Sequence, residues 1–316
     1  FLPISNSDLK RRWIPELDVI IITGDAYVDH HSYGAALIGR VLEDAGFMVG
    51  IIAQPDWRKK DDFTKLGRPK LFFGVTAGNL DSMVANYTAS KKPRRSDDYS
   101  PGGVGGYRPD RATILYTNRI RQAFKNIPIV LGGIEASMRR LAHYDWWSDQ
   151  VRRSVLLDSK ADILIYGMAE RQVLEIARRL KGGEDIKRMD YIPGAVVARS
   201  GIDNLKDYVE IPSFEEVASD KGKFNQAFKA IYLESDPIDG KTIVQRHGGR
   251  FVIQFPPALP QSTQELDKVY SLDYAQGWHP VYDKKRGVPG FETVRFSVTS
   301  HRGCCGGCSF CSLYLH

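Results

Sequence analysis

The stretch Asp18-Val-Ile-Ile-Ile-Thr-Gly-Asp25 decides the fold. Four apolar residues in succession predict a strand that is covered on both faces, as in a parallel sheet. The apolar spacing over residues 32–45 then predicts a helix, with Ser32 as its N-cap and Gly46 just beyond its end. The chain therefore opens as an alternating α/β protein.

The same alternation continues along the first half of the sequence. Further elements are predicted as strands over residues 48–53, 71–75, 127–131 and 162–166 and as helices over 112–124 and 173–180. Five strands alternating with helices predict a doubly wound parallel sheet, whose ligands bind beyond the carboxyl ends of the strands. Glycines there would admit a large flat ligand or would simply form tight turns. These strand ends are residues 23–25, 76–78, 132–135 and 167–170.

We divide the chain into three parts on this pattern. Residues 1–186 form a Rossmann-like domain, and residues 187–290, where the periodicity weakens, form a connector. Within the connector we expect two strands around the turn His247-Gly-Gly249. Residues 291–316 would begin a further domain with a strand over residues 293–298.

All four cysteines lie within eight residues, in Arg302-Gly-Cys-Cys-Gly-Gly-Cys-Ser-Phe-Cys311. Cys304, Cys308 and Cys311 have the spacing C-x3-C-x2-C, and Cys305 lies outside it. Three thiolates this close can bind three irons of a 4Fe-4S cluster and leave the fourth iron open to a substrate or cofactor. A zinc knuckle would require a second, distant cysteine pair, and disulfides here would leave nearly the whole chain uncrosslinked.

This segment resembles the cluster loop of the radical SAM enzymes. The resemblance implies that Cys304, Cys308 and Cys311 hold a 4Fe-4S cluster whose open iron binds S-adenosylmethionine. An external electron donor would reduce the cluster, and the cofactor would be cleaved to a 5′-deoxyadenosyl radical that abstracts hydrogen from an unknown substrate. The strand over residues 293–298 would be the first of a partial (β/α) barrel. On this interpretation the chain from Phe1 to His316 is a truncated piece that is inactive alone.

The N-terminal half resembles cobalamin-binding domains, which have a flavodoxin-like sheet. Residues 29–34 fit D-x-H-x-x-G, and Gly132-Gly133 resembles the diglycine of those domains. The resemblance implies a corrinoid site with His31 as the axial ligand of cobalt and Asp29 accepting the second ring N–H of His31. Its remaining members are Gly34, Gly132 and Gly133.

Across nearly its full length the chain also resembles the uncharacterised YgiQ-type radical SAM proteins. The matching stretches include residues 24–30, 52–57, 132–137, 142–146, 256–260 and 296–311. In that group the usual histidine is the one that matches His30. The alternative is therefore that the sheet domain keeps the cobalamin-binding fold but binds no cobalamin.

Composition limits the classes of protein. Apolar residues make up 42% of the chain and charged residues 26%, which is typical of a soluble globular protein. No apolar run approaches the ~20 residues that span a bilayer, and no signal segment opens the chain. Clustered cysteines without distant partners favour a reducing, cytoplasmic location. The net charge of +6 permits an anionic partner without requiring one.

A second hypothesis is a nucleic-acid-binding or RNA-modifying protein. Residues 138–153 interleave aromatic side chains with four arginines, at positions 139, 140, 152 and 153. Arginines and aromatics together can contact phosphates and stack on bases. The interpretation that we favour for this stretch is a helix with Leu141 inward and the arginines solvated or paired with Asp145 and Asp149. A third hypothesis is a non-catalytic corrinoid carrier.

Overall fold

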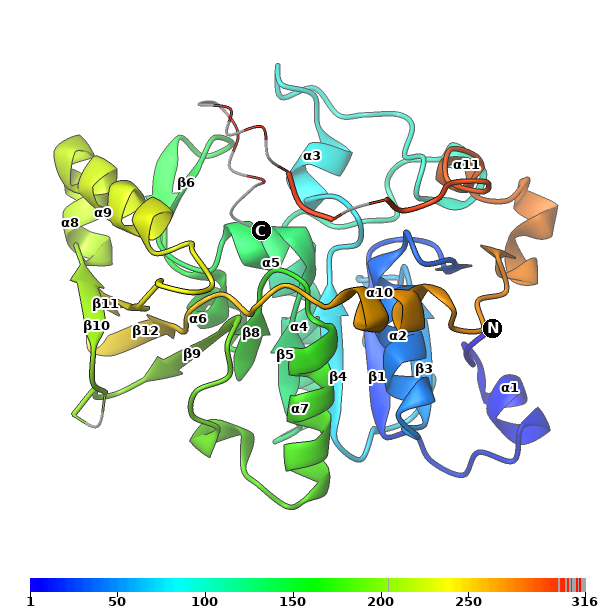
Figure 1. The fold of residues 1–316 in the computed structure, drawn as a ribbon. Helices are drawn as coiled ribbons and strands as arrows, with labels where there is room; N and C mark the ends of the chain where they lie inside the picture. Colours follow the sequence, from blue (N-terminus) through cyan, green and yellow to red (C-terminus); the bar gives the residue numbers. More distant parts are fainter. Residues whose placement is uncertain are drawn as a thin grey trace.

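The computed structural model describes residues 1–203, 205–300, 302–304, 306, 308, 311 and 313. In that part of the chain a nine-stranded sheet forms the centre of the molecule, with helices on both faces (Figure 1). The strand order is β10-β11-β12-β9-β8-β5-β4-β1-β3. The pairs β13-β2 and β6-β7 form two small sheets outside it.

The strands are, in chain order, β1 Val19–Thr23, β2 Val28–Asp29, β3 Val49–Ala53, β4 Phe72–Thr76, β5 Ile129–Leu131, β6 His143–Asp145, β7 Gln150–Arg152, β8 Ile163–Ile165, β9 Ala195–Arg199, β10 Tyr208–Ile211, β11 Thr242–His247, β12 Arg250–Gln254 and β13 Gly277–Trp278. The helices are α1 Asn6–Arg11, α2 Gly34–Asp44, α3 Ser82–Asn86, α4 Ala112–Ala123, α5 Gly133–Met138, α6 Val155–Ser159, α7 Glu170–Lys181, α8 Phe214–Ser219, α9 Lys221–Leu233, α10 Thr263–Tyr270 and α11 Pro289–Glu292. Short 3₁₀ turns cover Lys60–Phe63, Pro101–Gly103, Ile186–Arg188 and Pro280–Lys285.

Five strands, β3, β1, β4, β5 and β8, pair in parallel and form the predicted doubly wound half of the sheet. Their order corresponds to the flavodoxin-like arrangement, so the switch point lies between β1 and β4. Alternate residues of β1 enter opposite cores. Ile21 packs on the face covered by α2 and α7, whereas Ile20 and Ile22 pack on the other face with Tyr116 of α4. Both faces are covered, which explains the unbroken apolar run.

The predicted boundaries of these five strands are confirmed to within two residues. The prediction for the start of α2 is wrong, because the N-cap is Tyr33, which makes no side-chain capping bond. Ser32 instead belongs to the preceding turn, where its N–H donates to Nδ1 of His30 at 3.1 Å. Gly46 follows the helix with a φ of 84°, a conformation that favours glycine, as predicted.

The stretch predicted as a connector contributes four strands to the sheet. β9 pairs antiparallel with β8 and with β12, and β12 forms the expected hairpin with β11 around Gly248. The chain then returns over the parallel half, where Val269 of α10 packs against Leu37 and Val41 of α2 (Figure 1). The division at residue 186 stays a prediction, but the main sheet continues across it.

The strand predicted over residues 293–298 is absent. These residues form a turn after α11 and then irregular backbone, and Phe296 and Val298 are each 90% exposed. In the described part of the chain no strand pairs with this segment. An extended conformation would leave its backbone N–H and C=O groups without partners in a sheet.

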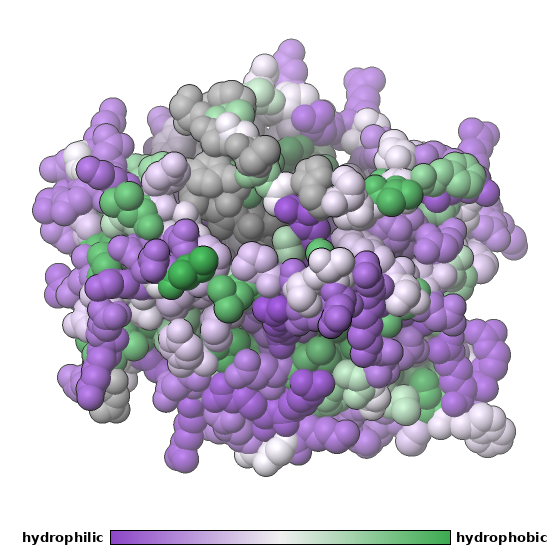
Figure 2. Space-filling model, in the orientation of Figure 1, coloured by the Kyte–Doolittle hydropathy of each residue, from purple (hydrophilic) through white to green (hydrophobic). Residues whose placement is uncertain are grey.

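The outer surface agrees with this architecture. Figure 2 shows that hydrophilic residues cover most of the described part of this face, with small separate hydrophobic spots. Among the described residues, no helix has the length and apolar character needed to cross a membrane.

We expect the two halves of the sheet to unfold as one unit. Val197 of β9 is 1% exposed and pairs with Ile163 of β8 and Ile253 of β12. Val197→Ala should lower the free energy of unfolding by about 2 kcal/mol, since it leaves a small cavity, and the transition should stay single. Val84→Ala, at a side chain that is 49% exposed, should change stability by less than about 0.5 kcal/mol. Two separate denaturant transitions would contradict a single unit.

Candidate functional site

A pocket of about 680 Å³ lies at the carboxyl ends of the parallel strands. Its deep part is apolar and is formed by side chains of the sheet, α2 and α7, including Ile21, Phe72, Val130 and Ile165. Its rim contains backbone of the strand ends and the start of the cysteine loop, which we define as residues 302–311. The pocket therefore lies where a doubly wound sheet binds its ligands.

Glycine is required at two of these strand ends by close approach of the backbone. A Cβ on Gly133, whose φ is 80°, would lie 2.3 Å from Oγ1 of Thr76 at the end of β4. A Cβ on Gly24 would lie 2.1 Å from the carbonyl oxygen of Ala77. The backbone after β1 and after β5 can therefore come this close to the end of β4 only at residues without a side chain.

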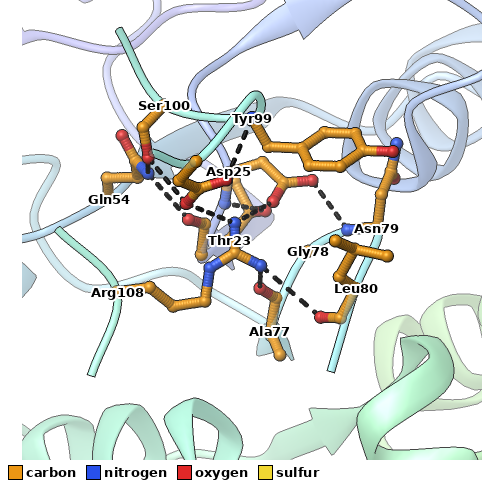
Figure 3. A network of polar contacts seen from close by, with 12 residues as sticks. Thr23, Asp25, Gln54, Ala77, Gly78, Asn79, Leu80, Tyr99, Ser100 and Arg108 are labelled. Carbon is orange, nitrogen blue, oxygen red and sulfur yellow. Dashed lines mark hydrogen bonds and ion pairs between the residues drawn. The ribbon is translucent and has the colours of Figure 1, made fainter. Parts of the chain in front are cut away.

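A buried polar network occupies the switch point between β1 and β4 (Figure 3). Nη2 of Arg108 donates to Oδ1 of Asp25 at 2.8 Å and to Oδ2 of Asp97 at 3.1 Å. Nη1 of Arg108 donates to the carbonyl oxygen of Ala77 at 3.0 Å, and the N–H of Asn79 donates to Oδ2 of Asp25 at 2.7 Å. One guanidinium thus ties the ends of both strands to the segment that contains Asp97.

The charges of this network do not balance. Two carboxylates share one guanidinium, and all three side chains are at most 5% exposed. Burial raises the pKa of Asp25 to about 6, although Arg108 and the N–H of Asn79 favour its charged form. The second carboxylate, Asp97, adds to the rise.

The predicted pair of Asp29 and His31 does not form, so this part of the prediction is wrong. Asp29 is fully buried, and its carboxylate accepts hydrogen bonds from Nε and Nη2 of Arg40 and from the N–H of Ala275. A buried guanidinium of opposite charge outcompetes a neutral imidazole for the carboxylate. His31 stacks on His30 with ring centroids 4.0 Å apart.

His31 is not among the residues that line the pocket. Its ring meets Tyr270 and Tyr274 edge-on, and both ring nitrogens are buried without a hydrogen-bond partner among the described residues. Burial and the nearby charge of Arg302 lower the pKa of His31, which keeps the ring neutral near pH 7. The Asp29 contact expected for a corrinoid ligand is missing, and axial ligation by His31 stays a prediction. Gly34, Gly132 and Gly133, in contrast, do line the pocket.

The thiols of Cys304, Cys308 and Cys311 are free, and the first of them lines the pocket. Cys304 and Cys308 are exposed and Cys311 is partly buried. A Cβ on Gly306 would lie 3.4 Å from the sulfurs of both Cys304 and Cys308, so the two thiols flank one glycine. The donor set suits an iron–sulfur cluster in its chemistry. Among the described residues, however, no three metal-binding side chains converge on one point.

Arg302 attaches the cysteine loop to the sheet domain. Its Nη1 forms an ion pair with Oε1 of Glu170, the first residue of α7, and its Nε donates to the hydroxyl of Tyr270 at 2.6 Å. The guanidinium also lies 5.1 Å from the ring centroid of Tyr270. The sequence contained no signal for this contact, because the partners lie 132 and 32 residues away. We call these three residues the Arg302 clasp.

Residues 138–153 do not form the helix that we favoured. They contain the β6–β7 hairpin, and their arginines are engaged within the protein. Arg139 pairs with Asp81 at 2.7 Å, and Nε of Arg140 donates to Oε1 of Gln254 at 2.7 Å. Arg152 and Arg153 both form ion pairs with Asp158. The structure therefore offers no observation that favours the nucleic-acid hypothesis here.

The comparisons with known proteins identify the family. Residues 1–297 match the family model described as Radical SAM N-terminal, so the chain belongs to that family. It is 56% identical over 316 residues to a UPF0313 protein of Clostridium botulinum (strain ATCC 19397 / Type A), covering 100% of this chain and 49% of the relative. A UPF0313 protein of Clostridium perfringens (strain ATCC 13124) is 51% identical over 317 residues, covering 100% of this chain and 48% of that relative.

These matches confirm the radical SAM resemblance and agree with the YgiQ-type group. The chain spans about half the length of the curated relatives that it matches. No solved structure matches the chain.

The charge imbalance at the switch point predicts a pH-dependent stability. The pKa of about 6 for folded Asp25 exceeds the ~4 of an unfolded aspartate, so the contribution of this group is full below pH ~4 and is lost as pH rises through 6. Asp25→Asn removes the charge and leaves Arg108 paired with Asp97. Denaturant unfolding from pH 4 to 7 should show the variant gaining about 2–3 kcal/mol relative to wild type.

The exposed neighbour Asp98 supplies the control. Asp98→Asn should give a difference from wild type that stays constant over the same pH range. A difference for Asp25→Asn that shrinks as pH rises would refute the charge assignment.

Proposed function

We propose that this chain is the N-terminal part of a radical SAM enzyme in which Cys304, Cys308 and Cys311 hold a 4Fe-4S cluster. Membership of the Radical SAM N-terminal family is the observation that carries the proposal. Three free thiols, the first of which lines the pocket, support it. When bound, such a cluster passes one electron from an external donor to S-adenosylmethionine, which yields methionine and a 5′-deoxyadenosyl radical. The proposal also places the protein in the reducing cytoplasm. It leaves the substrate unidentified.

The residues of this chain would act by positioning and by excluding water. The Arg302 clasp holds the first part of the cysteine loop over the strand ends, so that Cys304 lines the same pocket as Gly132 and Gly133. The apolar walls of the pocket would exclude water from it. Gly303, with a φ of 87°, lets the chain turn between the clasp and the first thiol.

The two other hypotheses have less support. The pocket at the strand ends agrees with the corrinoid hypothesis. His31, however, does not line this pocket, and Asp29 is bound to Arg40. We therefore assign no step to a corrinoid. The nucleic-acid hypothesis depended on arginines that are paired within the protein.

Single substitutions of the three cysteines test the proposal in the full-length protein. After anaerobic reconstitution, wild type should bind about four irons and release 5′-deoxyadenosine from S-adenosylmethionine under reduction. Cys304→Ser, Cys308→Ser and Cys311→Ser should each lose the cluster signal in electron paramagnetic resonance and most of the nucleoside release.

Cys305→Ser is the matched control, since this thiol lies in the same loop and outside the C-x3-C-x2-C spacing. It should keep the iron content and the activity of wild type. Full iron content and nucleoside release in any one of the three serine variants would reject the proposed ligand set.

A further inference from the structure

A strongly basic surface lies at the carboxyl-end edge of the sheet, outside residues 138–153. The segments 91–107 and 283–287 expose seven cationic side chains, and none of the seven forms an ion pair with another described residue. Two exposed carboxylates, Asp98 and Asp283, lie in the same segments, which leaves a net charge of +5, against +6 for the whole chain. We define this basic surface by its cations, Lys91, Lys92, Arg94, Arg95, Lys284, Lys285 and Arg286.

Backbone contacts join the two segments into one surface. The N–H of Gly102 donates to the carbonyl oxygen of Gly287 at 2.8 Å, and the N–H of Gly105 donates to the carbonyl oxygen of Arg95 at 3.1 Å. Nζ of Lys285 lies 5.4 Å from the ring centroid of Tyr107. The segment before α11 accordingly runs beside the connection between α3 and α4 (Figure 1). The cations therefore form one patch, which is the electrostatic footprint expected of a surface that binds a polyanion.

The first segment belongs to the connection between β4 and α4, residues 77–111. This long stretch contains only the short helix α3 and one 3₁₀ turn. Long irregular connections in compact domains usually carry a function. The same connection supplies Gly78, Asn79 and Tyr99 to the pocket at the strand ends. The chain that bears most of the basic surface thus also forms part of that pocket.

Two further pockets, of about 420 and 370 Å³, adjoin within this region, because Gly105 and Gly106 line both. Each volume is large enough for a nucleobase. Each pocket also combines aromatic and arginine side chains, which are the groups that stack on bases. These are Trp57, Tyr87 and Arg94 in the larger pocket and Tyr107 and Arg58 in the smaller one.

The arginines of the two pockets are held against the protein. Nε of Arg94 donates to the carbonyl oxygens of Val84 and Tyr87 at 3.1 and 3.0 Å. The guanidinium of Arg58 lies 4.2 Å from the ring centroid of Trp57. These contacts fix the cations in advance, which lowers the entropy lost when a ligand binds.

The carboxylates of these pockets already have partners in the protein. The three are bonded as follows: Asp110 accepts from Asn86 and Tyr87, Asp56 pairs with Arg58 and Lys59, and Asp62 accepts from the N–H of Asp56. None of the seven cations of the basic surface is used by them, so those cations stay available to an anionic ligand.

We propose that the basic surface binds single-stranded nucleic acid, with bases of the strand in the two pockets that share Gly105 and Gly106. The seven cations would contact phosphates, and the rings of Trp57 and Tyr107 would stack on bases. That the bound strand is the substrate rests on the proposed function; that it binds does not.

The two pockets favour a single strand over other polyanions. A duplex keeps its bases stacked and paired inside, so they cannot enter the pockets. An acidic protein segment has charge but no bases to stack. An anionic membrane would attract the cations and leave both pockets empty. Only an unpaired strand uses the charges and the rings together.

Oligonucleotide binding to the full-length protein without iron tests the ligand class. A single-stranded RNA of about 12 nucleotides should bind with a Kd of about 1 μM at about 100 mM salt. The logarithm of Kd should rise with the logarithm of salt concentration with a slope of about 3.5, which corresponds to about five phosphate contacts. Single-stranded DNA of the same sequence distinguishes the source: equal affinity supports recognition of phosphates and bases alone, and weaker binding supports RNA.

A duplex of the same length and polyglutamate are the comparison ligands. Both should bind at least about tenfold more weakly than the single strand, because neither offers bases for stacking. Equal affinity for either of them, or no binding of the single strands, would overturn the proposal.

Two variants separate the phosphate contacts from the base contacts. Lys92→Ala with Arg95→Ala should raise Kd about tenfold and lower the salt slope by about 1.4, or about 0.7 for each lost phosphate contact. Tyr107→Ala, at a side chain that is 37% exposed, should raise Kd about tenfold and leave the slope unchanged. Unchanged affinity in both variants would overturn the assignment of this surface.

Lys125→Ala with Arg188→Ala is the matched control. It also removes one exposed lysine and one exposed arginine, but Lys125 precedes β5 and Arg188 follows the end of α7, at the opposite edge of the sheet. Its Kd and salt slope should match wild type, and an equal loss of binding would overturn the proposal. Because none of these measurements needs iron, a failure here is distinct from a failure of the proposed cluster.

Discussion

The structure depends on how closely the ends of β1 and β4 meet at the switch point of the sheet. The strand ends approach so closely that Gly24 has no room for a side chain beside Ala77. Arg108 then binds Asp25 after β1, the carbonyl oxygen of Ala77 after β4, and Asp97 of a later loop. The guanidinium of Arg108 can be buried here because the sheet holds its hydrogen-bond partners in place. The same contacts hold the rim of the pocket in place.

The described residues of the cysteine loop form no comparable network within the loop. The described residues before it form a turn with exposed apolar side chains, and no strand pairs with them. Its position over the pocket depends on Arg302, which reaches α7 and the end of α10. Because α10 itself packs on α2, the loop is fixed to the same helices that form the pocket walls.

The sequence predicts well what local patterns determine. The five parallel strands were predictable because each carries a short apolar run, and the glycine-rich strand ends located the pocket. β9 and β10 were not, since the periodicity weakens after residue 186 and a sheet extension depends on partners far along the chain. The site contacts were the hardest to predict. Asp29 was expected to serve His31, but Arg40, eleven residues further on, takes its carboxylate. Glu170 and Tyr270 meet Arg302 only in the folded chain.

The buried ion pairs of this protein are better explained by position than by stability. Replacing a buried pair with apolar groups is often neutral in stability, because desolvation of the charges offsets their attraction. Stability alone would therefore not require Arg302 and Glu170 at the base of the cysteine loop, nor two polar atoms that have no partner among the described residues. The hydrogen bonds of an ion pair allow a narrower range of geometries than an apolar contact does. The ion pair between Arg302 and Glu170 therefore adds little stability, but it fixes the position of the cysteine loop relative to the pocket.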